Sequence, residues 1–176
     1  MVPPPRLERG TPRSTIWCSN QLSYARHYRI KCSLKKLFIE ELEKIYWAEK
    51  KLKKGLNIIK KACFNSTLAT LAENHLQITD KQILRIEKIF YLMNERIKTM
   101  SCDIAVTLIK EAKNIIKKFK TSACRDAALI FVAQKIEHYE IAIYGTLEQF
   151  ASNLGREDIA DILHETLVEE KESDKN

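Results

Sequence analysis

The sequence predicts an all-α protein, a bundle of long helices, and two features carry this prediction. All four prolines lie within the first twelve residues, and glycine occurs only four times in 176 residues. The chain after Pro12 therefore holds almost no residue that interrupts a helix. From Ser33 onward, apolar residues recur every three or four positions, which is the period at which a helix buries one face.

Composition places the chain among globular proteins with an apolar core. It contains 45% hydrophobic and 30% charged residues, proportions that are neither membrane-like nor typical of disorder. A length of 176 residues suits one main domain. No apolar run approaches the roughly 18 residues of a membrane-spanning helix, so we expect no membrane partner.

The cysteines indicate a reducing compartment. There are five, and none forms a CxxC pair or a zinc-type spacing with histidine (Cys18, Cys32, Cys63, Cys102, Cys124). Scattered cysteines in odd number are typical of free thiols. The sequence therefore predicts a cytoplasmic protein.

Residues 1–33 differ from the rest of the chain and are predicted to form a disordered basic extension of the helical domain, residues 34–176. They contain every proline and six basic residues against the single acid Glu8 (Arg6, Arg9, Arg13, Arg26, Arg29, Lys31). Such a segment could also touch nucleic acid or act in targeting. No groove-reading motif accompanies it, so nucleic acid is not an expected partner.

Five helices are expected in the domain, and most have a recognisable start or end. The side chains of Ser33, Asn65 or Ser66, and Ser122 are suited to capping helix N-termini, and Gly155 suits a left-handed C-terminal cap. The expected helices are 33–63, 67–93, 103–119, 123–153 and 157 onward, with 103–119 as a shorter crossover between two helical hairpins.

Carboxylates interrupt the apolar face of the helix expected over 123–153. Its apolar residues follow one stripe (Ile130, Ala133, Tyr144, Leu147, Ala151). Glu137 and Glu140 fall on the same stripe, three residues apart and so side by side. A carboxylate on a packed face is costly unless it is paired, protonated or bound to a metal.

Two further helices repeat this pattern. Glu49 lies within the apolar stripe of 33–63, while Glu170 and Asp174 continue the stripe of the last helix. One such acid alone would be a boundary residue reaching water. Acids on three helices that pack together predict a carboxylate-bridged dinuclear site, because two divalent cations relieve their repulsion. Iron and manganese both suit all-oxygen ligands.

From about Leu37 to the end, the chain resembles the bacterial YciE/YciF family of ferritin-like, rubrerythrin-related stress proteins. The resemblance rests on these stretches: Tyr46-Trp47-Ala48-Glu49-Lys50, His75-Leu76 with Thr79, Arg125-Asp126-Ala127-Ala128-Leu129-Ile130, Glu137-His138-Tyr139-Glu140-Ile141, Tyr144-Gly145-Thr146-Leu147 and Glu169-Glu170-Lys171. It implies a four-helix ferritin-like bundle that forms a homodimer, with a di-iron site that reacts with O₂ or peroxide. The implied metal ligands are Glu49, Glu137, Glu140, Glu170 and Asp174.

The second helix departs from the family pattern. The family reads His-Leu-Glu-Glu-Thr where this chain reads His75-Leu76-Gln77-Ile78-Thr79, so the acidic ligand expected there is missing. Only Gln77, His75 or Gln82 could replace it, and His75 is expected to support the core or the ligands. His138 points away from its acidic neighbours and is expected to lie on a flank or to make a contact between helices, not to bind metal. Two hypotheses follow: a di-iron oxidase with an impaired site, or a non-catalytic structural bundle that has lost metal binding.

Overall fold

The structure is a computed structural model that describes the backbone of residues 13–175 and the side chains of residues 33–175. Over this part of the chain every regular element is a helix, which confirms the all-α prediction. The elements are α1 (Arg13–Ala62), α2 (Ser66–Leu92), α3 (Asp103–Lys118), α4 (Ala123–Asn153) and α5 (Glu157–Ser173).

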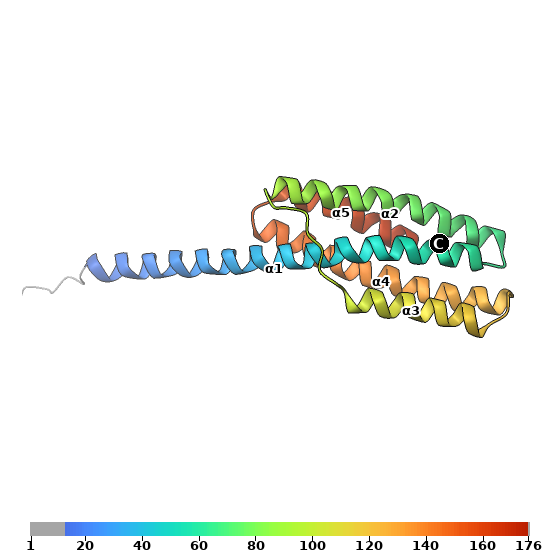
Figure 1. The fold of residues 1–176 in the computed structure, drawn as a ribbon. Coiled ribbons are helices and arrows are strands. Elements are labelled where there is room, and N and C mark those ends of the chain that lie inside the picture. Colours follow the sequence, from blue (N-terminus) through green and yellow to red (C-terminus); the bar gives the residue numbers. More distant parts are fainter. Residues whose placement is uncertain (1–12, 176) are drawn as a thin grey trace, which may run out of the picture.

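Four helices form a closed bundle. Helices α1 and α2 pack as one hairpin, α4 and α5 pack as another, and α1 meets α4 while α2 meets α5 (Figure 1). Helix α3 lies outside this ring and covers α1 and α4, as expected for the crossover. Large apolar side chains from all four bundle helices fill the core, among them Phe38, Phe90, Leu129 and Leu163.

The predicted caps are present at three helix ends. The Asn65 side chain accepts a hydrogen bond from the amide of Thr67 over 2.7 Å, and Ser122 accepts one from the amide of Arg125 over 3.4 Å. Gly155 has a φ of 75° just after α4, a conformation that glycine adopts without strain. The local sequence therefore specifies where α2 and α4 begin and where α4 ends.

Helix α1 begins twenty residues earlier than expected. Residues 1–12 of the predicted extension lie outside the described residues, but from Arg13 the chain is helical and joins the bundle helix without a break. This corrects the expectation that helix begins at Ser33. The physical reason is the absence of a breaker, since no proline or glycine lies between Pro12 and Gly55. The first part of α1 projects beyond the bundle (Figure 1).

A junction near one end of the bundle sets α4 against the α1–α2 hairpin. The buried Asp126 carboxylate accepts hydrogen bonds from the amides of Phe64 and Asn65, at 2.8 and 2.7 Å. The neighbouring Arg125 guanidinium donates to the carbonyl of Ala62, the last residue of α1. These bonds satisfy backbone groups that a helix end and a tight link leave without partners. None of the described helices has the length and apolarity to cross a bilayer.

Candidate metal centre

Four glutamates from three helices are buried inside the bundle. Glu49 on α1 and Glu170 on α5 are 0% exposed, while Glu140 and Glu137 on α4 are 1% and 8% exposed. Helix periodicity places each on an inward stripe, and hairpin packing brings the stripes together. The structure thus gathers the four glutamates that the sequence singled out.

Glu49 has one satisfied oxygen and one free oxygen. The buried hydroxyl of Tyr144 donates to Glu49 Oε1 over 2.5 Å, whereas Oε2 has no hydrogen-bond partner. Burial and the nearby charge of Glu170 raise the pKa of Glu49 to about 8, against the opposing effect of the Tyr144 hydrogen bond. In the metal-free protein, a pKa of about 8 favours the protonated form of Glu49 at neutral pH.

Glu140 and Glu170 lie beside it in the same environment. Burial, followed by the charges of Glu49 and Glu170, raises the pKa of Glu140 well above its ordinary value. Burial also raises the pKa of Glu170 to about 7. Oε2 of each side chain lacks a hydrogen-bond partner. Three buried carboxyl groups thus each present a free oxygen, a costly arrangement that a bound cation would relieve.

Helix α2 contributes His75, which sequence reasoning treated as a supporting residue. One ligand atom each from His75, Glu140 and Glu170 lie within 4.8 Å of one another. His75 Nε2 is 4.0 Å from Glu170 Oε2, and Nδ1 is 3.7 Å from Glu137 Oε1. Burial lowers the pKa of His75, which favours the neutral imidazole that binds metals. In the sequence, the feature that indicates His75 as a member of the cluster is its position on the same inward-facing stripe of α2 as Thr79 and Gln82.

Gln82 occupies the inward position on α2 that faces Glu170. It is 0% exposed, and its amide nitrogen donates a hydrogen bond to Glu170 Oε1. Thr79, one turn earlier, is also buried. Gln77, in contrast, is exposed, and Ile78 is half-buried. Of the neutral residues considered as replacements for the missing acid, Gln82 and His75 reach the cluster, while Gln77 does not.

Asp174 lies at the rim of the cluster. It is the C-cap of α5, and its Oδ1 is 3.3 Å from Nε2 of the exposed His138. This pair confirms the expected interhelical contact of His138. The pKa of Glu137 is raised to about 7, first by burial and then by the charges of Glu170 and Asp174, so Asp174 acts on the cluster through its charge.

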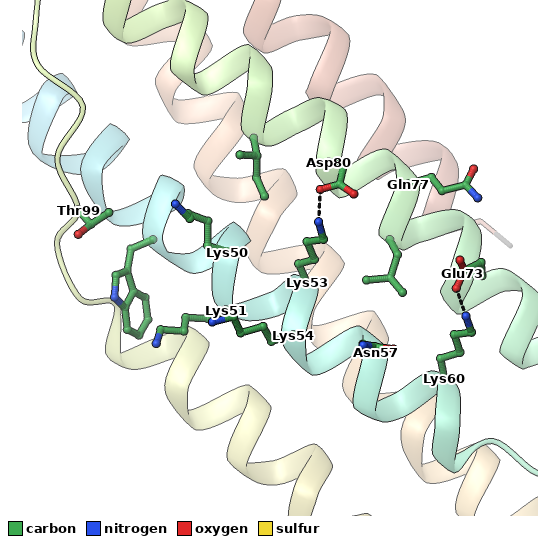
Figure 2. A pocket seen from close by; sticks show the side chains of 13 residues that line it. Lys50, Lys51, Lys53, Lys54, Asn57, Lys60, Glu73, Gln77, Asp80 and Thr99 are labelled. Carbon is green, nitrogen blue, oxygen red and sulfur yellow. Dashed lines mark hydrogen bonds and ion pairs between the residues drawn. The ribbon is translucent and has the colours of Figure 1, made fainter.

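A groove on the surface of the bundle is a different feature. It has a volume of about 770 Å³, runs between α1 and α2 and is lined by five lysines, two acids and the ring of Trp47. Figure 2 shows Lys53 reaching Asp80 and Lys60 reaching Glu73 across it. These ion pairs join the two helices on their outer side. None of the four buried glutamates lines the groove, so the groove and the glutamate cluster are separate features.

The donor set fits a cation. Ligand atoms of His75, Glu140 and Glu170 lie within 4.8 Å of one another, and Glu49, Glu140 and Glu170 each carry a buried oxygen without a hydrogen-bond partner. A closed four-helix bundle with inward carboxylates from facing helices is the ferritin-like class of protein.

The chain belongs to the family described as Domain of unknown function (DUF892), which it matches over residues 33–176. It is 42% identical over 143 residues to Protein YciF of Escherichia coli strain K12, covering 81% of this chain and 86% of YciF. The resemblance to the YciF-like stress protein family is therefore confirmed.

Solved structures agree with this assignment. The crystal structure of the E. coli stress protein YciF matches with a TM-score of 0.77 at 42% identity, over 80% of this chain and 89% of that one. YcfI of Rhodopseudomonas palustris matches with a TM-score of 0.78 at 34% identity, over 81% of this chain and 90% of the other. The bundle is thus a shared fold of these relatives.

Proposed function

We propose that this protein is a ferritin-like stress-associated protein that binds iron at the glutamate cluster and reacts with O₂ or peroxide. The observation that carries the proposal is the meeting of buried carboxyl groups from α1, α4 and α5, each with an unpartnered oxygen. Manganese is the alternative metal for the same oxygen ligands. When bound, iron supplies electron exchange with oxygen species.

The residues of the chain have distinct parts in this proposal. Glu140 and Glu170 would bind the cation after losing protons, with neutral His75 beside them, so loading releases protons and strengthens with pH. Glu49 is kept in place by Tyr144 and offers its free oxygen. Asp174 at the rim adds negative charge near Glu137. Closely packed apolar side chains around the cluster exclude bulk water.

Metal analysis and ferrous oxidation test this proposal together. Purified protein supplemented with iron is expected to retain it through gel filtration and to oxidise Fe(II) faster than the spontaneous reaction. Glu140→Gln replaces the carboxyl group with a neutral amide of the same shape, so it should fold normally and lose both properties. Glu172→Gln, an exposed change on α5, should keep both. Unchanged metal content and oxidation in Glu140→Gln would overturn the assignment.

A second candidate function is a non-catalytic structural or interaction bundle. The observation in its favour is Gln82, an amide at the inward position on α2 that faces Glu170. One relative of similar fold, YcfI of Rhodopseudomonas palustris, is described as a candidate structural protein. On this alternative the buried glutamates stay protonated and no metal is retained. Elemental analysis of protein grown with iron separates the two candidates.

The compartment and assembly state belong to the same proposal. We place the protein in the cytoplasm, which the free thiols of Cys63, Cys102 and Cys124 support. We also propose a homodimer, without a nucleic-acid or membrane partner. Light scattering coupled to gel filtration gives the mass directly, and a mass of 20.5 kDa would rule out the dimer.

A further inference from the structure

We infer that the centre in this chain is built for one transition-metal cation, held by His75, Glu140 and Glu170, with Gln82 positioning Glu170. This inference rests on the proposed metal binding and narrows it. The resemblance implies two metals per chain. Among residues 33–175, the described groups bring together one set of three ligand atoms within 4.8 Å, and it is this set.

The hydrogen bonds of the cluster limit the oxygens that remain for a second cation. A carboxylate can bridge two metals with one oxygen on each, and a hydrogen bond to either oxygen competes with that use. In Glu170, Oε1 accepts from Gln82 and Oε2 is free. In Glu49, Oε1 accepts from Tyr144 and Oε2 is free. The Gln82 and Tyr144 donors thus leave each of these glutamates one oxygen without a competing hydrogen bond.

On α2, Gln82 is the residue that restricts the oxygens available to a second cation. A glutamate there would bring a charge and two acceptor oxygens toward Glu170, whereas the amide brings a neutral donor. Its own Oε1 is buried without a hydrogen-bond partner, as is the hydroxyl of Thr79. Both groups are neutral, and Gln82 contacts the set of three through Glu170. They can complete the coordination of one cation but cannot offset the charge of another.

His75 also determines which cation is accepted. A site with an imidazole nitrogen binds divalent first-row transition metals, Mn(II) the most weakly of them, whereas magnesium and calcium prefer an all-oxygen shell. His75 extends from α2 toward the two glutamates, and its Nε2 lies 4.0 Å from Glu170 Oε2. A cation between them would draw both atoms into coordination distance. We therefore expect transition metals to be retained in the presence of excess magnesium.

The test is a binding measurement that does not depend on turnover. Mn(II) is titrated into metal-free protein and followed by calorimetry and by the electron paramagnetic resonance signal of free Mn(II). The wild type is expected to bind one Mn(II) per chain, and His75→Gln should weaken binding at least tenfold. Gln82→Glu should admit a second Mn(II). Glu172→Gln is the matched control and should bind one.

Every result of this titration is informative. Two Mn(II) per wild-type chain would overturn the inference and leave the proposed metal binding intact. No retention of manganese or of iron in any variant would overturn the proposed function itself. Wild-type stoichiometry of one with no loss in His75→Gln would show that the cation sits elsewhere. Circular dichroism and urea unfolding of each variant distinguish loss of ligands from loss of fold.

Discussion

The hydroxyl of Tyr144 and the carboxyl group of Glu49 form a fully buried hydrogen bond, 2.5 Å long, between α4 and α1. It joins two helices that belong to different hairpins. Because Glu49 Oε1 is satisfied in this way, the side chain has one defined orientation before any metal arrives. Pre-set ligands lose less conformational freedom on binding than mobile ones.

Removing that hydroxyl is expected to destabilise the metal-free protein. Tyr144→Phe keeps the ring but leaves Glu49 Oε1 without a donor, and an unsatisfied buried acceptor costs about 1–3 kcal/mol. Urea unfolding followed by circular dichroism measures the change. Tyr91→Phe is the matched control, since Tyr91 is 82% exposed and its loss of a hydroxyl should have almost no effect. Equal stabilities for the two variants would contradict the role assigned to Tyr144.

The metal-free protein should become less stable as pH rises. The pKa values of Glu49, Glu137 and Glu170 are raised from 4.5 to about 8, 7 and 7. The folded state therefore binds protons that the unfolded chain has released. Such groups contribute stability that is complete below pH 4.5 and is lost as pH rises to about 8. Thermal unfolding in the presence of a chelator, measured between pH 5 and 8, should show a falling midpoint.

Two comparisons check this pH dependence. Glu140→Gln removes one of the titrating groups, so the midpoint of that variant should fall less steeply with pH. Added Mn(II) should reverse the trend for the wild type, because a cation binds the ionised carboxylates that high pH favours. A midpoint of metal-free protein that rises between pH 5 and 8 would contradict the buried, protonated state of the cluster.

Asp126 is expected to be a determinant of stability without a part in metal binding. Asp126→Ala deprives the amides of Phe64 and Asn65 of their acceptor, and each lost bond to a charged group costs about 1.5–3 kcal/mol. Urea unfolding should report a large loss, while metal stoichiometry of the folded protein stays unchanged. The exposed change Asp161→Asn serves as the control.

Replacement by alanine should change the stability of the protein in opposite directions at Gly145 and Gly155, because the two positions differ in backbone conformation and in the room for a Cβ atom. A Cβ added at Gly145, inside α4, would meet Leu167 Cδ2 at 3.7 Å, an ordinary contact. Gly145→Ala should therefore stabilise the protein by about 0.5–1 kcal/mol. Gly155→Ala should destabilise it by roughly 1 kcal/mol, because φ is 75° there. Unfolding midpoints of the two variants that move in the same direction would contradict this account.

Local patterns in the sequence were sufficient for most of the fold. The caps at Asn65 and Ser122 and the turn at Gly155 act within a few residues, so each could be predicted without knowledge of the packing. The start of α1 could not be predicted in this way. The first part of α1 has the basic, polar composition that is typical of disordered segments. It is helical nevertheless, because no proline or glycine separates Arg13 from the part of α1 in the bundle.

The buried glutamates were also predictable, because an acid at a position of the apolar helical repeat can be recognised from the sequence alone. The distances between side chains on different helices depend on how the hairpins are aligned. That alignment brings His75 into the cluster, turns Gln77 outward and places Asp174 at the rim beside His138. It also sets Gln82 opposite Glu170, a pair separated by 88 residues that no local pattern could join.

The two hairpins divide the centre between them. The α1–α2 hairpin carries Glu49, His75 and Gln82, whereas the α4–α5 hairpin carries Glu137, Glu140 and Glu170. If His75, Glu140 and Glu170 bind the proposed cation, neither hairpin alone contains all three ligands, so the cation would be bound only when the two hairpins have packed together. Metal retention would therefore report the packing of the two hairpins, and a chain that unfolds in either hairpin would release the cation.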